Sequence, residues 1–146
     1  MTTSVKNGKK PKVVLDTNVL ISALVFGGKP RQITDLLADE MIRVAISHEA
    51  LTELRRKITA KFPDSVEVLK RFEKLLERDA QLVTLGSIQI NICQDPDDNK
   101  FIETAVLGNC DFIISGDRHL LGIGQYEDIK IIKPAAFLKL LEDSKL

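Results

Sequence analysis

The 146-residue chain has no tryptophan, only two cysteines and no excess of charge of either sign. Lys and Arg together number 21, as do Asp and Glu, so the overall charge does not mark the protein as a nucleic-acid binder. Aromatic residues make up 5% of the chain, which provides no evident platform for stacking single-stranded bases. Zero net charge does not exclude nucleic-acid binding, because acidic and basic side chains could be separated onto different faces of the protein.

The two cysteines, Cys93 and Cys110, are too few for a disulfide framework and lack the spacing of a metal motif. We interpret them as reduced thiols of a cytoplasmic protein. No apolar segment is long enough to span a bilayer, and the N-terminal sequence MTTSVKNGKKPK lacks the apolar stretch of a signal peptide. We expect residues 1–11 to form a flexible basic tail and residues 12–143 to form a single domain.

Short apolar runs rich in β-branched residues alternate with segments of helical periodicity. The predicted strands cover residues 12–16, 42–46, 112–115 and 129–132. The predicted helices cover residues 17–25, 47–61 and 63–79, and Ser47 is the candidate N-cap of the second of them. Further helices follow Pro30, Asp98 and Pro134. Residues 82–85 and the alternating Ile88, Ile90 and Ile92 are typical of a strand or an extended segment. This order predicts an α/β fold with a mainly parallel central sheet, in which the helical pair 47–79 lies over one edge.

Two of the predicted strands run into an aspartate. Val13–Leu15 is followed directly by Asp16, and Phe112–Ile114 is followed, after a Ser-Gly pair, by Asp117. The carboxyl ends of parallel strands are where open α/β sheets bind ligands. The two aspartates therefore predict one acidic site assembled by the fold, although they lie far apart in the chain.

Two further acids hold informative positions. Glu53 lies within the predicted helix 47–61, and Asp98 lies at the start of a later helix. Carboxylate oxygens are the ligands that Mg²⁺ and Mn²⁺ prefer, and such an ion relieves the repulsion among clustered carboxylates. A site of this kind cleaves phosphodiesters by activating water and stabilising the leaving oxygen.

Each acid also has a structural interpretation. Asp16 could be the N-cap of the helix that follows it, Asp117 could cap the short turn at residues 118–120, and Asp98 could be a turn or cap residue. Glu53 could pair with Lys57 one helical turn later. Considered one at a time, Glu53 is better explained by the structural role, whereas the structural and functional interpretations are about equal for each of the other three acids. The combination of four acids, two of them at strand ends, favours a functional site.

The sequence around these acids resembles the motifs of a known family, the PIN-domain nucleases. Residues 13–22 (VVLDTNVLIS) resemble the family's opening motif, residues 95–105 (DPDDNKFIETA) its third motif and residues 110–121 (CDFIISGDRHLL) its fourth. The resemblance extends through residues 12–140 in the family's order. Within the family, the sequence is similar to the small bacterial PIN proteins that are regarded as toxins of toxin–antitoxin pairs.

The resemblance implies a three-layer α/β/α sandwich and an endoribonuclease that depends on Mg²⁺ or Mn²⁺ and leaves a 5′-phosphate and a 3′-hydroxyl. It also implies a homodimer and, for a toxin, a cognate antitoxin protein. By position it assigns catalysis to four acids: Asp16, Glu53, Asp98 and Asp117. Asp16, Asp98 and Asp117 would bind the metal, and Glu53 would complete the site or orient the attacking water. Asn18 and Ser115 match the polar residues that support the first and last acids by hydrogen bonding.

Details around the motifs leave three questions open. Many members carry an acid two places after the fourth one, where this chain has His119, so the number of metal ions is open. Asp95 and Asp97 compete with Asp98 for the third role, and the spacing to the following apolar residues favours Asp98. The basic residues near the site are Arg55, Arg56, Lys57 and Arg118. They could contact RNA phosphates, and a solvated surface is an equal alternative.

Other functions fit parts of the pattern. A haloacid-dehalogenase-type phosphatase also begins with an apolar strand ending in aspartate, but it needs a second aspartate where this chain has Asn18. A calcium loop of the EF-hand type needs glycine and glutamate where the chain has Lys100 and Val106. A non-catalytic PIN-like module that binds RNA or protein is the main alternative, although the presence of all four acids favours an enzyme.

Overall fold

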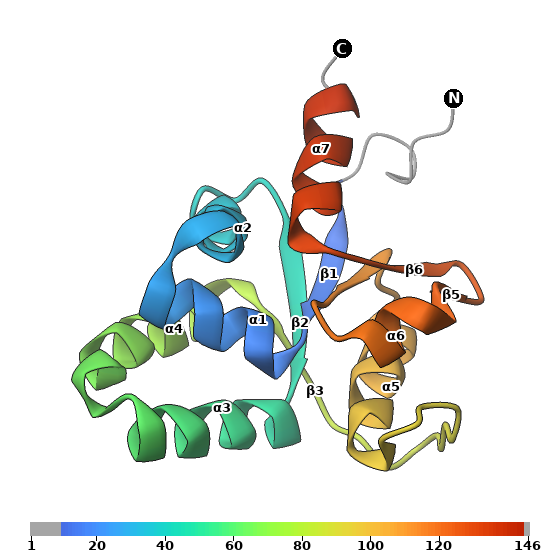
Figure 1. The fold of residues 1–146 in the computed structure, drawn as a ribbon, viewed down its shortest axis with the longest axis horizontal. Helices are drawn as coiled ribbons and strands as arrows, with labels where there is room; N and C mark the ends of the chain where they lie inside the picture. The colour runs from blue at the N-terminus through green and yellow to red at the C-terminus, as the bar shows by residue number, and fades with distance from the viewer. Residues whose placement is uncertain (1–9, 145–146) are drawn as a thin grey trace.

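The central sheet has six strands in the order β3–β2–β1–β4–β6–β5 (Figure 1). The computed structural model describes residues 10–144, so residues 1–9 of the predicted tail lie outside the described residues. The strands are Lys12–Leu15 (β1), Arg43–Ser47 (β2), Gln81–Val83 (β3), Phe112–Ile114 (β4), Gln125–Tyr126 (β5) and Ile129–Ile132 (β6). Only the β5–β6 pair is antiparallel. The mainly parallel sheet is the one that the sequence predicts.

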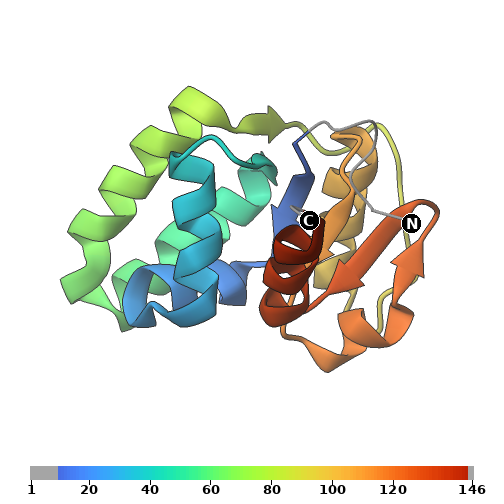
Figure 2. The same cartoon turned by 90° about the horizontal axis from the view of Figure 1, so that it is seen from above.

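Helices cover both faces of this sheet, which gives three layers. The helices are Thr17–Ile21 (α1), Gly28–Ala38 (α2), His48–Lys61 (α3), Val66–Asp79 (α4), Asn99–Leu107 (α5), Arg118–Ile123 (α6) and Pro134–Ser144 (α7). Helix α5 packs on β1, β2 and β4, and α7 lies on the opposite face, next to α2 (Figure 2). The predicted α/β/α sandwich is confirmed. None of the helices within residues 10–144 is long and apolar enough to cross a membrane.

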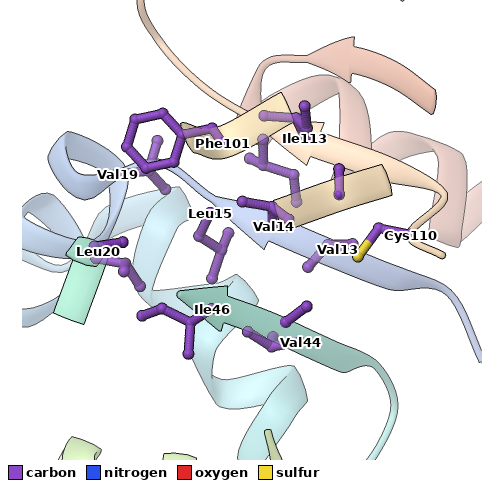
Figure 3. Close-up of a cluster of buried hydrophobic side chains, with 14 of the residues drawn as sticks. Val13, Val14, Leu15, Val19, Leu20, Val44, Ile46, Phe101, Cys110 and Ile113 are labelled. Atoms are coloured by element: carbon purple, nitrogen blue, oxygen red, sulfur yellow. The ribbon is translucent and has the colours of Figure 1, made fainter. Parts of the chain in front are cut away.

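Strands β1 and β4 form the centre of the core because both of their faces are buried. Successive side chains of a strand point to opposite faces, so β4 contacts both helical layers. Phe112 packs edge-on against Phe137 of α7, with ring centroids 5.4 Å apart. Ile113 points to the other side, where Phe101 of α5 closes the cluster (Figure 3).

The helix boundaries follow from local signals in the sequence. The Ser47 hydroxyl accepts the Ala50 N–H at 3.0 Å, which confirms the predicted N-cap of α3. The helix predicted over residues 17–25 divides into α1 and a π-helical turn, Ser22–Phe26, and ends at Gly27, whose φ is +84°. Helices α3 and α4 share a hollow with β2 and β3, so this pair lies at the predicted edge of the sheet.

The structure adds one strand that the sequence did not predict, and it decides between the two alternatives, a strand or an extended segment, for the region of alternating isoleucines. The short edge strand β5 was not predicted, because its two residues are too few for a periodic signal. Residues 84–95 form no strand despite the alternating isoleucines. Their backbone is instead held by two side chains of α5. Glu103 accepts the Ile90 N–H at 2.9 Å, and Asn99 accepts the N–H groups of Ile92 and Cys93 at 3.1 and 3.0 Å.

Candidate active site

The four predicted acids line one hollow of about 160 Å³ beyond the carboxyl ends of β1 and β4. The site thus lies where the crevice rule for open α/β sheets places it. The lining residues come from the segments that follow both strands, from α1 and α3, and from the start of α5 with the turn before it. They are Asp16, Thr17, Asn18, Glu53, Lys57, Asp95, Asp97, Asp98, Phe101 and Asp117.

Asp16 and Asp117 each cap the helix that follows their strand. Asp16 Oδ1 accepts the Val19 N–H at 2.8 Å, and Asp117 Oδ2 accepts the Leu120 N–H at 3.0 Å. Asp16 is thus the N-cap that the sequence suggests, and Asp117 caps the helix α6 where only a short turn was expected. Capping does not compete with a functional role, because each carboxylate has a second oxygen and further lone pairs. The cap hydrogen bonds hold the carboxylates in a defined orientation at the hollow.

Ser115 joins the two strand ends. Leu15 and Ile114 are partners in the β1–β4 register, so the next residues of the two strands, Asp16 and Ser115, are also neighbours. The Ser115 hydroxyl donates to Asp16 Oδ2 and accepts the Asp117 N–H at 3.0 Å. Ser115 thereby contacts both strand-end acids, as the resemblance implies for this position.

Asp16 is the most buried acid of the hollow, with 4% of its surface exposed. Burial raises the pKa of its carboxyl above the ordinary value, and hydrogen bonds from Ser115 and Val19 partly offset this rise. The nearby charge of Asp117 adds to the increase. Asn18 is exposed at the mouth of the hollow, and its backbone N–H, rather than its side chain, acts on Asp16.

Asp98 occupies the N-cap position of α5 but makes no side-chain cap bond. Its neighbour Asp95 performs the local capping by accepting the Asp97 N–H at 3.0 Å. Burial and the charges of Asp95, Asp117 and Asp16 raise the pKa of Asp98 to about 6. A carboxylate that its own helix does not use, beside other acids, is available to a cation.

Glu53 has different surroundings from the three aspartates. Its carboxylate accepts a hydrogen bond from the Thr17 hydroxyl of α1. Two ammonium groups also lie near it, Lys57 Nζ at 3.7 Å and Lys100 Nζ at 3.4 Å. The i,i+4 pair with Lys57 that the sequence suggests is present, and it lies inside the hollow rather than on an open helix face.

Thr17 and Lys100 belong to this site but were not selected from the sequence. Thr17 and Lys100 contact Glu53 only because α1, α3 and α5 meet at the hollow, and no periodic signal reports such a contact. Asp97, one of the two competitors for the third role, is exposed and pairs with Lys100 at 2.8 Å. This ion pair lowers the pKa of Asp97, so its carboxylate is already neutralised within the protein.

The predicted RNA-contacting residues are not all in one place. Lys57 lines the acidic hollow, whereas Arg55 pairs with Glu73 of α4 and lines the separate hollow between α3, α4 and the β2–β3 edge. Arg56 and Arg118 are exposed. His119 is also exposed and does not line the acidic hollow.

The donor set of the hollow fits Mg²⁺ or Mn²⁺ in kind, because it consists of carboxylate oxygens. Burial, and after it the charges of Asp95, Asp117 and Asp16, raise the pKa of Asp98, so a cation beside these acids would be favoured. Within residues 10–144, no three Asp, Glu, His or Cys side chains lie close enough together to form a complete metal-binding site by themselves. Mg²⁺ keeps several waters and needs only one or two direct carboxylates, so an open arrangement of this kind suits it.

Comparisons with known proteins agree with the fold and the motifs. Residues 12–119 match the family model described as PIN domain. The uncharacterized protein MJ1680 of Methanocaldococcus jannaschii is 36% identical over 118 residues, which cover 78% of this chain and 76% of that protein. A chain in the crystal structure of VapBC2 from Rickettsia felis, bound to a DNA fragment from their promoter, has a TM-score of 0.57 and 15% identity. That likeness covers 82% of this chain and 96% of the other, and it concerns the fold alone.

Proposed function

The chain belongs to the PIN-domain family, whose members are generally nucleases, and from this premise we propose that it is an endoribonuclease dependent on Mg²⁺ or Mn²⁺. The observation that carries the proposal is the division of the acidic hollow into two parts. Asp16, Asp98 and Asp117 repel one another, whereas Glu53 is paired with cations.

The three aspartates would hold the metal ion directly or through water. When bound, the ion would lower the pKa of a water molecule and stabilise the leaving oxygen. Ser115 and the N-cap bonds hold Asp16 and Asp117 in place for this role. Glu53, fixed by Thr17, would accept a hydrogen bond from the attacking water and orient it for in-line attack at the phosphorus. The products would carry a 5′-phosphate and a 3′-hydroxyl.

Lys57 and two exposed arginines supply the phosphate contacts in this proposal. Lys57 lines the hollow. Arg56 is exposed on α3, the helix that carries Glu53, and Arg118 is exposed at the start of α6, directly after Asp117. Arg55 is engaged with Glu73 and would contribute less. Phosphate contacts of this kind provide affinity without sequence specificity.

The first test is cleavage of several RNAs with Mg²⁺ or Mn²⁺, comparing the wild type with Asp16→Asn. We expect the variant to lose at least about 100-fold in rate, because it removes a charge from the metal-binding set. Asp128→Asn, an exposed acid in the β5–β6 turn, is the matched control and should cleave like the wild type. Equal cleavage by wild type and Asp16→Asn would refute the site, and no cleavage by either would favour a binding module.

We further propose that this ribonuclease is the toxin of a toxin–antitoxin pair, with a cognate antitoxin protein and a homodimeric state. The resemblance of its motifs to small bacterial PIN proteins of such pairs supports this, and the fold it shares with the VapBC2 structure is compatible with it. Expression of the wild type should arrest growth, and Asp16→Asn should not. A protein encoded beside this gene should relieve the arrest by binding the acidic hollow.

A further inference from the structure

A lysine is buried among the acids of the hollow. The side chain of Lys100, in the first turn of α5, is only 10% exposed. Its ammonium lies 3.4 Å from Glu53 Oε1, 2.8 Å from Asp97 Oδ2 and 3.1 Å from the Asp97 carbonyl oxygen. The face of the Phe101 ring lies 4.8 Å from the same nitrogen. A charge that has left water at this depth must be stabilised by its partners.

These contacts leave Lys100 little capacity to bind a substrate phosphate. An ammonium group has three protons, and three oxygens of Glu53 and Asp97 surround it. The aromatic ring covers another side. Lys57 differs in both respects, because its side chain is 29% exposed and its salt-bridge partner Glu53 is 3.7 Å away. Of the two lysines, Lys57 is the one able to turn toward an RNA backbone.

Lys100 instead connects two parts of the site. Glu53 comes from α3, and Lys100 comes from α5, two residues after Asp98. The ion pair ties the Glu53 carboxylate to the turn that carries Asp98. It also places a permanent positive charge beside a group of carboxylates that repel one another.

We propose that Lys100 is a positioning residue that fixes the Glu53 carboxylate relative to Asp98 and balances the negative charge of the hollow when no divalent cation is bound. The proposal rests on the nuclease function proposed above. It makes two opposite predictions for the loss of Lys100. Catalysis should weaken because Glu53 is no longer held, whereas a divalent cation should bind more tightly because a competing positive charge has gone.

The test measures both quantities in Lys100→Gln, with Lys139→Gln on the exposed surface of α7 as the matched control. Titration with Mn²⁺ at pH 8, followed by the electron paramagnetic resonance of the free ion, should show about 3- to 10-fold tighter binding in Lys100→Gln. At saturating Mn²⁺, kcat for RNA cleavage should fall at least about 10-fold, with KM within about twofold of the wild type. The control should match the wild type in both assays.

Lys100→Arg separates charge from position. It retains the positive charge, so Mn²⁺ affinity should stay within about twofold of the wild type. Its planar fork does not reproduce the compact arrangement of three oxygens, so only part of kcat should return. If Lys100→Gln does not fold, Lys100→Met, which keeps the aliphatic stem against Phe101, replaces it in the same assays.

Several outcomes would overturn the proposal. A raised KM with an unchanged kcat would identify Lys100 as a phosphate contact, and unchanged or weaker Mn²⁺ binding would refute its role in charge balance. A Glu53→Gln background provides a further check, because the additional loss of Lys100 should then change kcat by less than about threefold. If the wild type itself cleaves no RNA, the proposed function fails, whereas the Mn²⁺ titration still decides whether Lys100 balances the charge.

Discussion

At the scale of single residues, the N-cap bonds of Asp16 and Asp117 also orient the carboxylates at the hollow. Each bond uses one oxygen of its carboxylate, and Ser115 contacts the second oxygen of Asp16. Asp98 lacks such a bond and is the acid whose pKa rises to about 6. The site therefore combines two rigidly held acids with one that its own helix leaves free.

Asp98 predicts a pH dependence for both stability and activity. Because the folded protein raises the pKa of Asp98 from 3.8 to about 6, the folded state binds the proton more tightly than the unfolded chain. The free energy of unfolding of the metal-free protein should therefore fall as pH rises from about 4 to about 7. Cleavage should show the opposite trend and decline as pH falls through about 6, because a protonated Asp98 is a poor metal ligand.

Asp98→Asn tests this assignment at pH 8. Removing the charge should stabilise the metal-free protein by about 1 kcal/mol, a value reduced for solvent screening of a half-buried group. Mn²⁺ should raise the melting temperature of the wild type but have a much smaller effect on the variant. Thermal unfolding with and without Mn²⁺ measures both, with Asp128→Asn as the control. A variant less stable than the wild type without metal would contradict the raised pKa.

At the scale of elements, the turn that carries Asp95 and Asp98 depends on the side chains of α5. Asn99 accepts two backbone N–H groups from the preceding segment and donates to the Pro96 carbonyl oxygen at 3.0 Å. Glu103, one helical turn later, accepts the Ile90 N–H. Three backbone N–H groups of this segment are thus bonded to side chains of the helix that follows it, rather than to a neighbouring strand.

Asn99→Ala should release this segment. The variant removes three hydrogen bonds of a buried side chain and should lower the free energy of unfolding by about 1–3 kcal/mol. Amide hydrogen exchange at Ile92 and Cys93 should accelerate, whereas exchange in β1 and β4 should change only with global stability. Asn91→Ala, an exposed amide in the same segment, serves as the control. Unchanged protection at Ile92 and Cys93 would show that the segment is held by other contacts.

At the scale of the whole molecule, the strand order β2–β1–β4 brings the acids together. Strand β1 ends at Asp16, β4 leads to Asp117, and the helix after β2 carries Glu53. Helix α5 crosses the same three strands and begins directly after Asp98. Four carboxylates that are distant in sequence thereby line one hollow, and the ammonium groups of Lys57 and Lys100 lie beside the negative charge that results.

The sequence by itself was enough to predict the central strands, most of the helices and the four acids that line the hollow. Apolar runs identified β1 and β4, Ser47 identified the start of α3, and the ends of the two central strands identified Asp16 and Asp117. These features depend on residues within a few positions of one another, so periodicity and capping preferences report them directly. The positions of Glu53 and Asp98 made them the other candidate acids, and the family motifs then assigned them roles in catalysis.

Only the tertiary structure decided which charges face one another. It paired Lys100 with Glu53 and Asp97, left Asp98 without a cap bond, directed Arg55 to another hollow and held residues 84–95 on α5. Each of these results requires contact between elements whose distance in space has no relation to their distance in sequence. The strength of such a contact is set by burial and by the other charges nearby, which exist only once the sheet and its helices have packed.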